Sequence, residues 1–351
     1  MMKKLLVIAL VLLLSLAALA GCTQQPAAPT PSPADTTPGD TTDPAPPAAP
    51  AYPTRTIEFV VPFSAGGGSD IFARTIVSII NQYNMVDQTI NVVNRTGGGG
   101  AIGYAFTAEQ YGDPYFLAAV GSSFYNAYLV GQSPVNFRDF RVVGALADES
   151  LGVWVRYDSP ITSLREAIEM VREEPGSLII SSTGGISLGS VAYYMLQHEE
   201  DVEFSYVPFD GGADALTALL GGHVDITLEN PGTARAHHEA GTIRLLAIAY
   251  EHRIPGFEDV PTFREEGVDI VLSQVRGFIM PAGTPDYAIA FWEDIFRQVF
   301  ETPEFQEAYL LENSLIPLLL NSEEYLAAFE EITAFFLEAF ATMGFDVVEW
   351  D

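Results

Sequence analysis

The chain has 351 residues and is strongly acidic, with 16 Lys and Arg against 46 Asp and Glu and a formal net charge of −30. Such a charge makes nucleic acids and anionic lipid surfaces poor partners. Because there is only one cysteine, the sequence excludes an internal disulfide, and its place near the N-terminus excludes a thiol nucleophile or a cysteine metal site in the folded part.

The N-terminus has the pattern of a lipoprotein signal peptide, which we predict over residues 1–21. Lys3 and Lys4 precede an apolar run of about fifteen residues, shorter than the roughly 20 that a membrane-spanning helix needs. The run ends in Leu-Ala-Gly-Cys, which looks like a bacterial lipobox, so Cys22 is the predicted site of cleavage and lipidation. An ordinary secretory signal with a chance cysteine is the alternative.

The composition changes abruptly after this cysteine. Residues 22–51 are almost entirely Thr, Pro, Ala, Gln, Asp, Ser and Gly. Such a segment buries too little apolar surface to order itself, and its prolines keep it extended. We expect a disordered tether that holds a soluble domain off a membrane.

The folded part is predicted to begin with a strand, a glycine loop and a helix. The apolar residues 57–61 lead into Gly66-Gly67-Gly68, and Ser69-Asp70 opens a segment with helical periodicity. Glycines let the backbone approach a ligand, and the free N–H groups of a first helical turn attract anions. This stretch therefore predicts a small anion site.

The same pattern recurs along the chain. Apolar strand-like runs lead into glycine- or serine-rich loops after residues 94, 120, 180 and 208, and helix-like periods follow. Ser163-Leu-Arg-Glu166 reads as a capping box, and Gly221-Gly222 as a helix stop. The alternation predicts an α/β protein with largely parallel sheets, whose ligands lie outside the carboxyl ends of the strands.

Several motifs occur in an order that resembles a known family. They are Val61-Pro62-Phe63 with Gly66-Gly67 and Asp70, Asn94-Arg95 before a glycine run, Phe137-Arg138-Asp139-Phe140, Val207-Pro208-Phe209, Leu220-Gly221-Gly222-His223-Val224-Asp225, and Pro281-Ala282-Gly283-Thr284-Pro285. The set resembles the Bug/TctC family, the extracytoplasmic solute-binding proteins of tripartite tricarboxylate transporters. The resemblance covers the chain from Tyr52 to about Gly344.

The resemblance implies a periplasmic-binding-protein-like (type II) fold, a two-lobed Venus flytrap with the ligand cleft between the lobes. We place lobe 1 at residues 52–152 and 276–351 and lobe 2 at residues 153–275. The implied function is capture of a small di- or tricarboxylate, or a related organic acid, through backbone amides and hydroxyls. The loaded protein, a monomer anchored to the bacterial membrane at Cys22, would deliver the solute to permease subunits.

Ligand-binding residues are carried over position by position. They are Phe63, Ser64, Ala65, Gly66, Gly67, Gly68, Ser69 and Asp70 in the first loop; Ser122, Ser123 and Asn126 after the third strand; and Ser182, Thr183, Gly184, Ser187, Ser190, Phe209, Asp210, Gly211, Gly212 and Asn230 in the second lobe. Asp70 is also a candidate for capping its own helix, and the serine hydroxyls are candidates for local capping. No metal, cofactor or nucleic acid is expected.

Three other functions stay open on the sequence. Asp210 replaces a basic residue that many relatives have, so it is a candidate partner for the ammonium of an amino acid. The same fold could present its loaded form to a membrane sensor kinase. A more distant alternative is an extracellular hydrolase, although the five histidines flank no obvious nucleophile.

Overall fold

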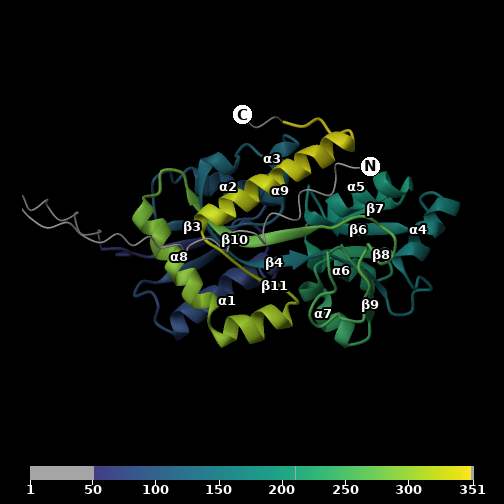
Figure 1. Cartoon of the computed structure of the whole chain (residues 1–351), viewed down its shortest axis with the longest axis horizontal. Coiled ribbons are helices and arrows are strands. Elements are labelled where there is room, and N and C mark those ends of the chain that lie inside the picture. Colours follow the sequence, from purple (N-terminus) through teal and green to yellow (C-terminus); the bar gives the residue numbers. More distant parts are fainter. Residues whose placement is uncertain (1–50, 210, 349–351) are drawn as a thin grey trace, which may run out of the picture. The chain divides into compact units, whose positions relative to one another are not determined.

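Two β-sheets with helices packed on them organise the part of the chain that the computed structural model describes, residues 51–209 and 211–348 (Figure 1). The predicted signal peptide, the tether up to residue 50 and Cys22 lie outside the described residues, and so does Asp210. Among the helices in the described ranges, none is long and apolar enough to cross a bilayer.

The first sheet has six strands in the order β11-β4-β10-β3-β1-β2. Its strands are β1 (Ile57–Val61), β2 (Ile90–Asn94), β3 (Phe116–Ala119), β4 (Phe140–Ser150), β10 (Ser273–Pro281) and β11 (Ile316–Leu320). β1 pairs in parallel with β2 and β3, whereas β10 runs antiparallel to β3 and β4, and β11 antiparallel to β4.

The second sheet has five strands in the order β7-β6-β8-β5-β9. Its strands are β5 (Gly152–Arg156), β6 (Ile179–Thr183), β7 (Ser205–Phe209), β8 (Ile226–Glu229) and β9 (Ile243–Ile248). β6 is parallel to β7 and β8, and β5 is antiparallel to β8 and β9. The chain is thus α/β with two lobes, and the first lobe takes strands from both ends of the described chain.

The expectation of largely parallel sheets is wrong, because each sheet is mixed. Strands joined through a crossover helix run parallel, as in β1, β2 and β3. The strands that connect the two lobes have no such crossover. β4 runs almost directly into β5 with only Leu151 between them, and β10 returns the chain to the first sheet. These connecting strands form the antiparallel half of each sheet.

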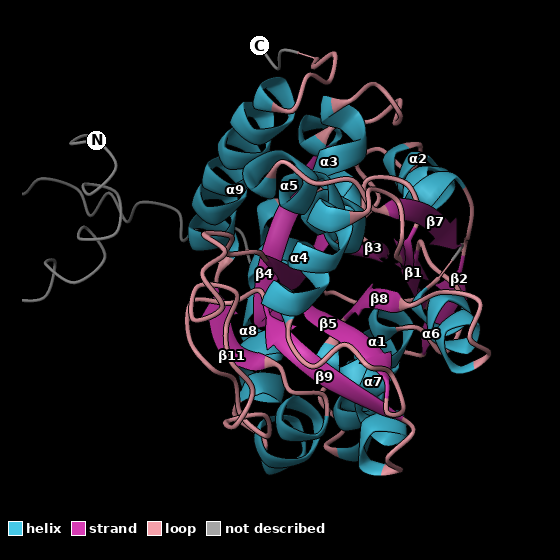
Figure 2. Cartoon of the chain, turned by 90° about the vertical axis from the view of Figure 1, so that its right-hand side faces the viewer, coloured by secondary structure: helices cyan, strands magenta, loops and turns pink. Residues whose placement is uncertain are grey.

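Nine α-helices are present in the described residues. They are α1 (Gly68–Gln82), α2 (Ala101–Ala108), α3 (Ser123–Leu129), α4 (Leu164–Glu173), α5 (Leu188–Glu200), α6 (Gly212–Leu220), α7 (Pro231–Glu239), α8 (Asp286–Phe300) and α9 (Ser322–Thr342). The helices predicted after Ser69, Ser190 and Gly212 are confirmed as α1, α5 and α6, and α6 ends before Gly221-Gly222 as predicted. In Figure 2 the helices flank the strands of both sheets.

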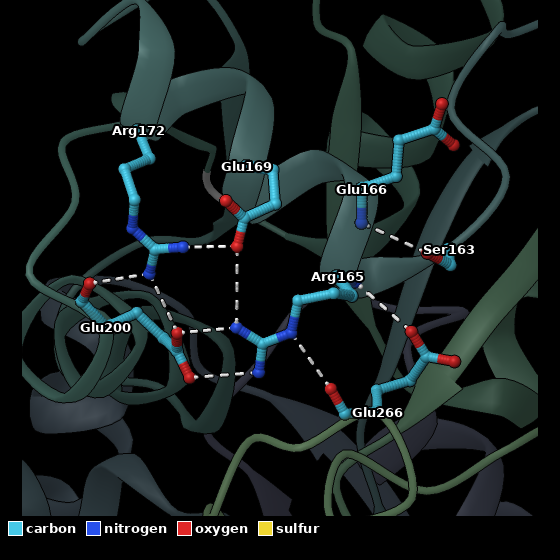
Figure 3. A network of polar contacts seen from close by, with 7 residues as sticks. All are labelled: Ser163, Arg165, Glu166, Glu169, Arg172, Glu200 and Glu266. Atoms are coloured by element: carbon cyan, nitrogen blue, oxygen red, sulfur yellow. Dashed lines mark hydrogen bonds and ion pairs between the residues drawn. The ribbon is translucent and has the colours of Figure 1, made fainter.

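The capping box predicted at α4 forms only in part. The Ser163 hydroxyl accepts a hydrogen bond from the Glu166 N–H at 3.0 Å (Figure 3). The Glu166 carboxylate accepts from the N–H and the hydroxyl of Thr162, both at 2.6 Å. The helix start is capped as expected, with the acid reaching one residue further back.

An ion-pair network ties α4 to its neighbours (Figure 3). Arg165 donates to Glu200 at the end of α5 at 2.8 Å and to the carbonyl oxygen of Glu266 at 3.0 Å. Arg172 also reaches Glu200, at 3.1 Å. Burial raises the pKa of Glu200, but the hydrogen bonds and charges of the two arginines outweigh it and the net pKa is lowered. The network joins α4, α5 and the segment before β10 into one body.

The two lobes touch one another through a shared apolar cluster. Phe124 and Val60 from the first lobe belong to the same buried cluster as Ile186 and Leu228 from the second. Farther out, the rings of Tyr194 on α5 and Phe345 after α9 lie 5.0 Å apart. The structure therefore shows the lobes in contact around the cleft.

Candidate functional site

A cavity of about 410 Å³ lies between the two lobes. Its wall is built from the carboxyl ends of strands and the first turns of α1, α5, α6 and α7. The first turn of a helix has free N–H groups and the positive end of the helix dipole, so these starts favour anions. The first residues of α1 and α6 are glycines, and a Cβ at these positions would collide with the side chains of Arg276 and Glu229 respectively.

Most residues predicted from the sequence reach this wall. Those that line the cavity are Phe63, Ser64, Gly67, Gly68, Ser69, Ser122, Ser123, Thr183, Gly184, Ser187, Phe209, Gly211, Gly212 and Asn230. Six others do not line it: Ala65, Gly66, Asp70, Asn126, Ser182 and Ser190. Asp210 lies outside the described residues, so its predicted role stays a prediction.

Asp70 organises the first loop from behind. Its buried carboxylate accepts hydrogen bonds from the Gly66 N–H, from Arg74 Nε and from Asn94 Nδ2, each at 2.9 Å. Asn94 also donates to the carbonyl oxygen of Phe63 at 3.0 Å. Burial by itself raises the pKa of Asp70, but the three donors outweigh it, so the pKa lies below its usual value. The Asp70 side chain fixes the conformation of the loop and does not itself line the cavity.

The second-lobe hydroxyls are largely committed to their own loop. Ser187 caps α5, accepting from the Ser190 N–H at 3.2 Å, and Ser190 donates to the carbonyl oxygen of Gly185 at 2.8 Å. Ser182 hydrogen-bonds to the hydroxyl of Tyr206 at 2.7 Å. Local capping, one of the two roles considered for these hydroxyls, is what the geometry shows for Ser187.

Two of the predicted residues make hydrogen bonds between the lobes. The hydroxyl of Ser122 accepts from the Leu188 N–H at 2.9 Å, and Asn126 Nδ2 donates to the carbonyl oxygen of Ile186 at 3.2 Å. Ser123 differs from both, because its buried hydroxyl has no hydrogen-bond partner among the described residues.

A buried ion pair, which sequence reasoning missed, lies beside the cavity. Arg276 Nη2 donates to both carboxylate oxygens of Glu149 at 2.5 Å, and the two side chains are only 3% and 6% exposed. Gln274 donates to the same carboxylate and accepts from the Ser122 N–H at 2.9 Å. Arg276 Nη1 reaches the hydroxyl of Ser69 at 3.4 Å. The pair thus connects the crossing strands to the first turn of α1.

Period-two spacing was the signal that could have found this set. Gln274 and Arg276 are polar residues two apart near the start of a strand whose later residues are apolar, so they share one face. Glu229, which ends β8, is a second missed residue on the cavity wall. Burial raises its pKa to about 7, assisted by the charge of Glu149 and opposed by the Asn230 N–H and Arg276.

Replacing Asp70 should loosen the loop in a pH-dependent way. We expect Asp70→Asn to cost about 1–3 kcal/mol at pH 7, because a buried acceptor of three donors is lost. Since the folded-state pKa is lowered, this contribution is present above the unfolded-state pKa of about 4 and disappears as pH falls through the folded-state value. Urea unfolding at pH 7 and below pH 4 measures it. Asp158→Asn, in the exposed pair with Arg156, is the control and should change little.

Removing one partner of the buried ion pair should destabilise the protein more than replacing both partners by apolar residues. Arg276→Met alone leaves Glu149 as an uncompensated buried charge, and we expect a loss of roughly 3–5 kcal/mol. The double variant Arg276→Met/Glu149→Leu should lose less than either single variant. Chemical denaturation measures all three, and Arg297→Met, in an exposed pair with Glu301, is the control. Additive losses in the double variant would contradict the coupling.

Residues 74–333 match the family model described as "Tripartite tricarboxylate transporter family receptor" (TctC).

The chain belongs to this family.

One relative is the "UPF0065 protein in gbd 5'region" of Cupriavidus necator, 31% identical over 277 residues that cover 78% of this chain and 83% of the relative. The periplasmic binding protein BugD has a similar solved structure, with a TM-score of 0.77 and 25% identity, covering 84% of this chain and 99% of BugD. A protein of R. palustris solved with adipate is also similar, with a TM-score of 0.78 and 25% identity, covering 85% of this chain and 99% of that one.

Family membership confirms several expectations from the sequence. The Bug/TctC resemblance and the periplasmic-binding-protein-like fold with two lobes are both correct. This TctC-family chain is a solute-binding receptor and not an enzyme, so the hydrolase alternative falls away. The similarity to a periplasmic binding protein points to an extracytoplasmic location.

Proposed function

We propose that this TctC-family protein captures a small organic carboxylate in the cavity between its lobes and delivers it to the permease of a tripartite tricarboxylate transporter. The observation that carries the proposal is the convergence of four helix N-termini on one cavity, since the positive end of each helix dipole favours an anion. The R. palustris protein solved with adipate, which has the same fold, supports a carboxylate ligand.

In this proposal each of the two sheets forms the centre of one lobe, and the lobes close around the ligand. Residues 52–152 and 276–351 would form one lobe and residues 153–275 the other, joined by β4–β5 and by the segment that leads into β10. Closure would bring the glycine amides of α1 in the first lobe towards those of α5 and α6 in the second. The hydrogen bonds from the Leu188 N–H to Ser122 and from Asn126 to the Ile186 carbonyl oxygen already join the two lobes across this cavity and would be broken on opening.

The site is tested by ligand binding to matched variants. We expect at least one of adipate, succinate, malate or citrate to raise the melting temperature, because a ligand that binds only the folded state stabilises it. Gly67→Val should abolish this shift by blocking backbone approach, whereas Ser64→Ala should weaken binding by no more than about 1–2 kcal/mol. Calorimetric titration measures both affinities, and unshifted melting temperatures of the free variants show that they fold. Equal affinity of Gly67→Val and the unchanged protein would overturn the site.

Attachment to the membrane is tested separately. We propose that Cys22 is lipidated and that the monomeric receptor is held at the cell surface by this anchor. Cys22→Ala, produced as the full chain in a bacterium, should lose incorporation of labelled palmitate. Thr23→Ala is the control and should keep the label. Incorporation of palmitate into Cys22→Ala would contradict the anchor.

A further inference from the structure

Glu229 is an acid on the wall of a cavity that otherwise offers donors. It ends β8, and its side chain is 6% exposed. The carboxylate packs against the first turn of α6 so closely that a Cβ added to Gly212 would lie 2.0 Å from its Oε2. Its Oε1 accepts from the Asn230 N–H, at the start of α7, at 3.0 Å. The carboxyl group therefore occupies the donor side of the cavity.

No counter-ion in the described part of the wall is free for this acid. The charged groups that act on it are Glu149 on β4 and Arg276 on β10. Arg276 is already engaged by both oxygens of Glu149, so the pair is close to neutral. The residues that face Glu229 from α6 and α7 are Gly212, Asn230 and Thr233, which carry no charge. An ionised Glu229 would thus be the net charge of this wall.

A carboxylate ligand would meet that charge at short range. Two carboxylates in a site shielded from water repel strongly, and such pairs relieve the repulsion by sharing a proton. Burial raises the pKa of Glu229 to about 7, so at neutral pH its proton is gained at little cost. The protonated group is also a hydrogen-bond donor, whereas the ionised group only accepts.

We propose that Glu229 takes up one proton from solvent when the cavity binds a carboxylate, and donates that proton in a hydrogen bond to the ligand. Glu229 thereby makes the cavity selective for a negatively charged ligand. This rests on the function proposed above. No covalent bond forms; one proton and one ligand enter together and leave together. The cavity then selects carboxylates at or below neutral pH, and it binds them less well when Glu229 must stay ionised.

Two measurable consequences follow from the linkage between ligand and proton. Above the pKa that Glu229 has in the ligand-free protein, affinity for a carboxylate should fall by about tenfold for each unit of pH, and each binding event should take up about one proton. Below that pKa the affinity should level off. Glu229→Gln keeps a donor of the same shape without a titrating group, so its affinity should change less than about twofold over the same range.

The experiment is calorimetric titration of the protein with adipate, succinate, malate and citrate between pH 6 and pH 8.5. Each pH is measured in two buffers of different ionisation enthalpy, neither of them a carboxylate or phosphate, so that the protons taken up can be counted. Asp148→Asn is the matched control, because Asp148 is another acid on β4 whose burial raises its pKa, but it does not line the cavity. It should keep the pH dependence of the unchanged protein.

Each outcome either supports or overturns the proposed role of Glu229. Proton uptake by the unchanged protein that Glu229→Gln loses supports the proposal. Carboxylate binding at pH 8.5 without proton uptake overturns it, and this result needs no variant. Uptake that persists in Glu229→Gln also overturns it. Failure of every carboxylate to bind either protein at pH 6 overturns the proposed function itself and this proposal with it.

Discussion

The buried ion pair between Arg276 and Glu149 is the contact on which the arrangement of the cavity depends. It joins β10 to β4, the two strands that carry the chain between the lobes, and it lies beside the start of α1. Both charges have left water, so each is stable only in the presence of the other. Gln274 extends the pair to the loop after β3 through the Ser122 N–H. One network therefore orients the lobe junction and the cavity wall together.

Around this network, the protein uses backbone groups to attract an anion. The overall charge is −30, and the single arginine on the described cavity wall is already paired with an acid. Helix N-termini supply the compensation, because their N–H groups carry partial positive charge without adding a titrating side chain. Gly212 shows the cost of this design, since no side chain fits where the Glu229 carboxylate packs against it.

The hydroxyls and acids around the loops are mostly structural. Asp70 binds three donors behind the first loop, and Ser187 caps α5. These interactions shape the loops, whose backbone remains available to a ligand.

The sequence by itself determined the local elements and the family. Strand, glycine loop and helix start follow from short-range patterns, and the helices after Ser69 and Gly212 formed where periodicity predicted them. Parallel pairing was overestimated, because local patterns do not show which strands connect the lobes. Only the tertiary structure brought Glu149 to Arg276, 127 positions away, and turned Glu229 towards the cavity. Such contacts depend on strand register and packing between distant segments, which composition and spacing do not encode.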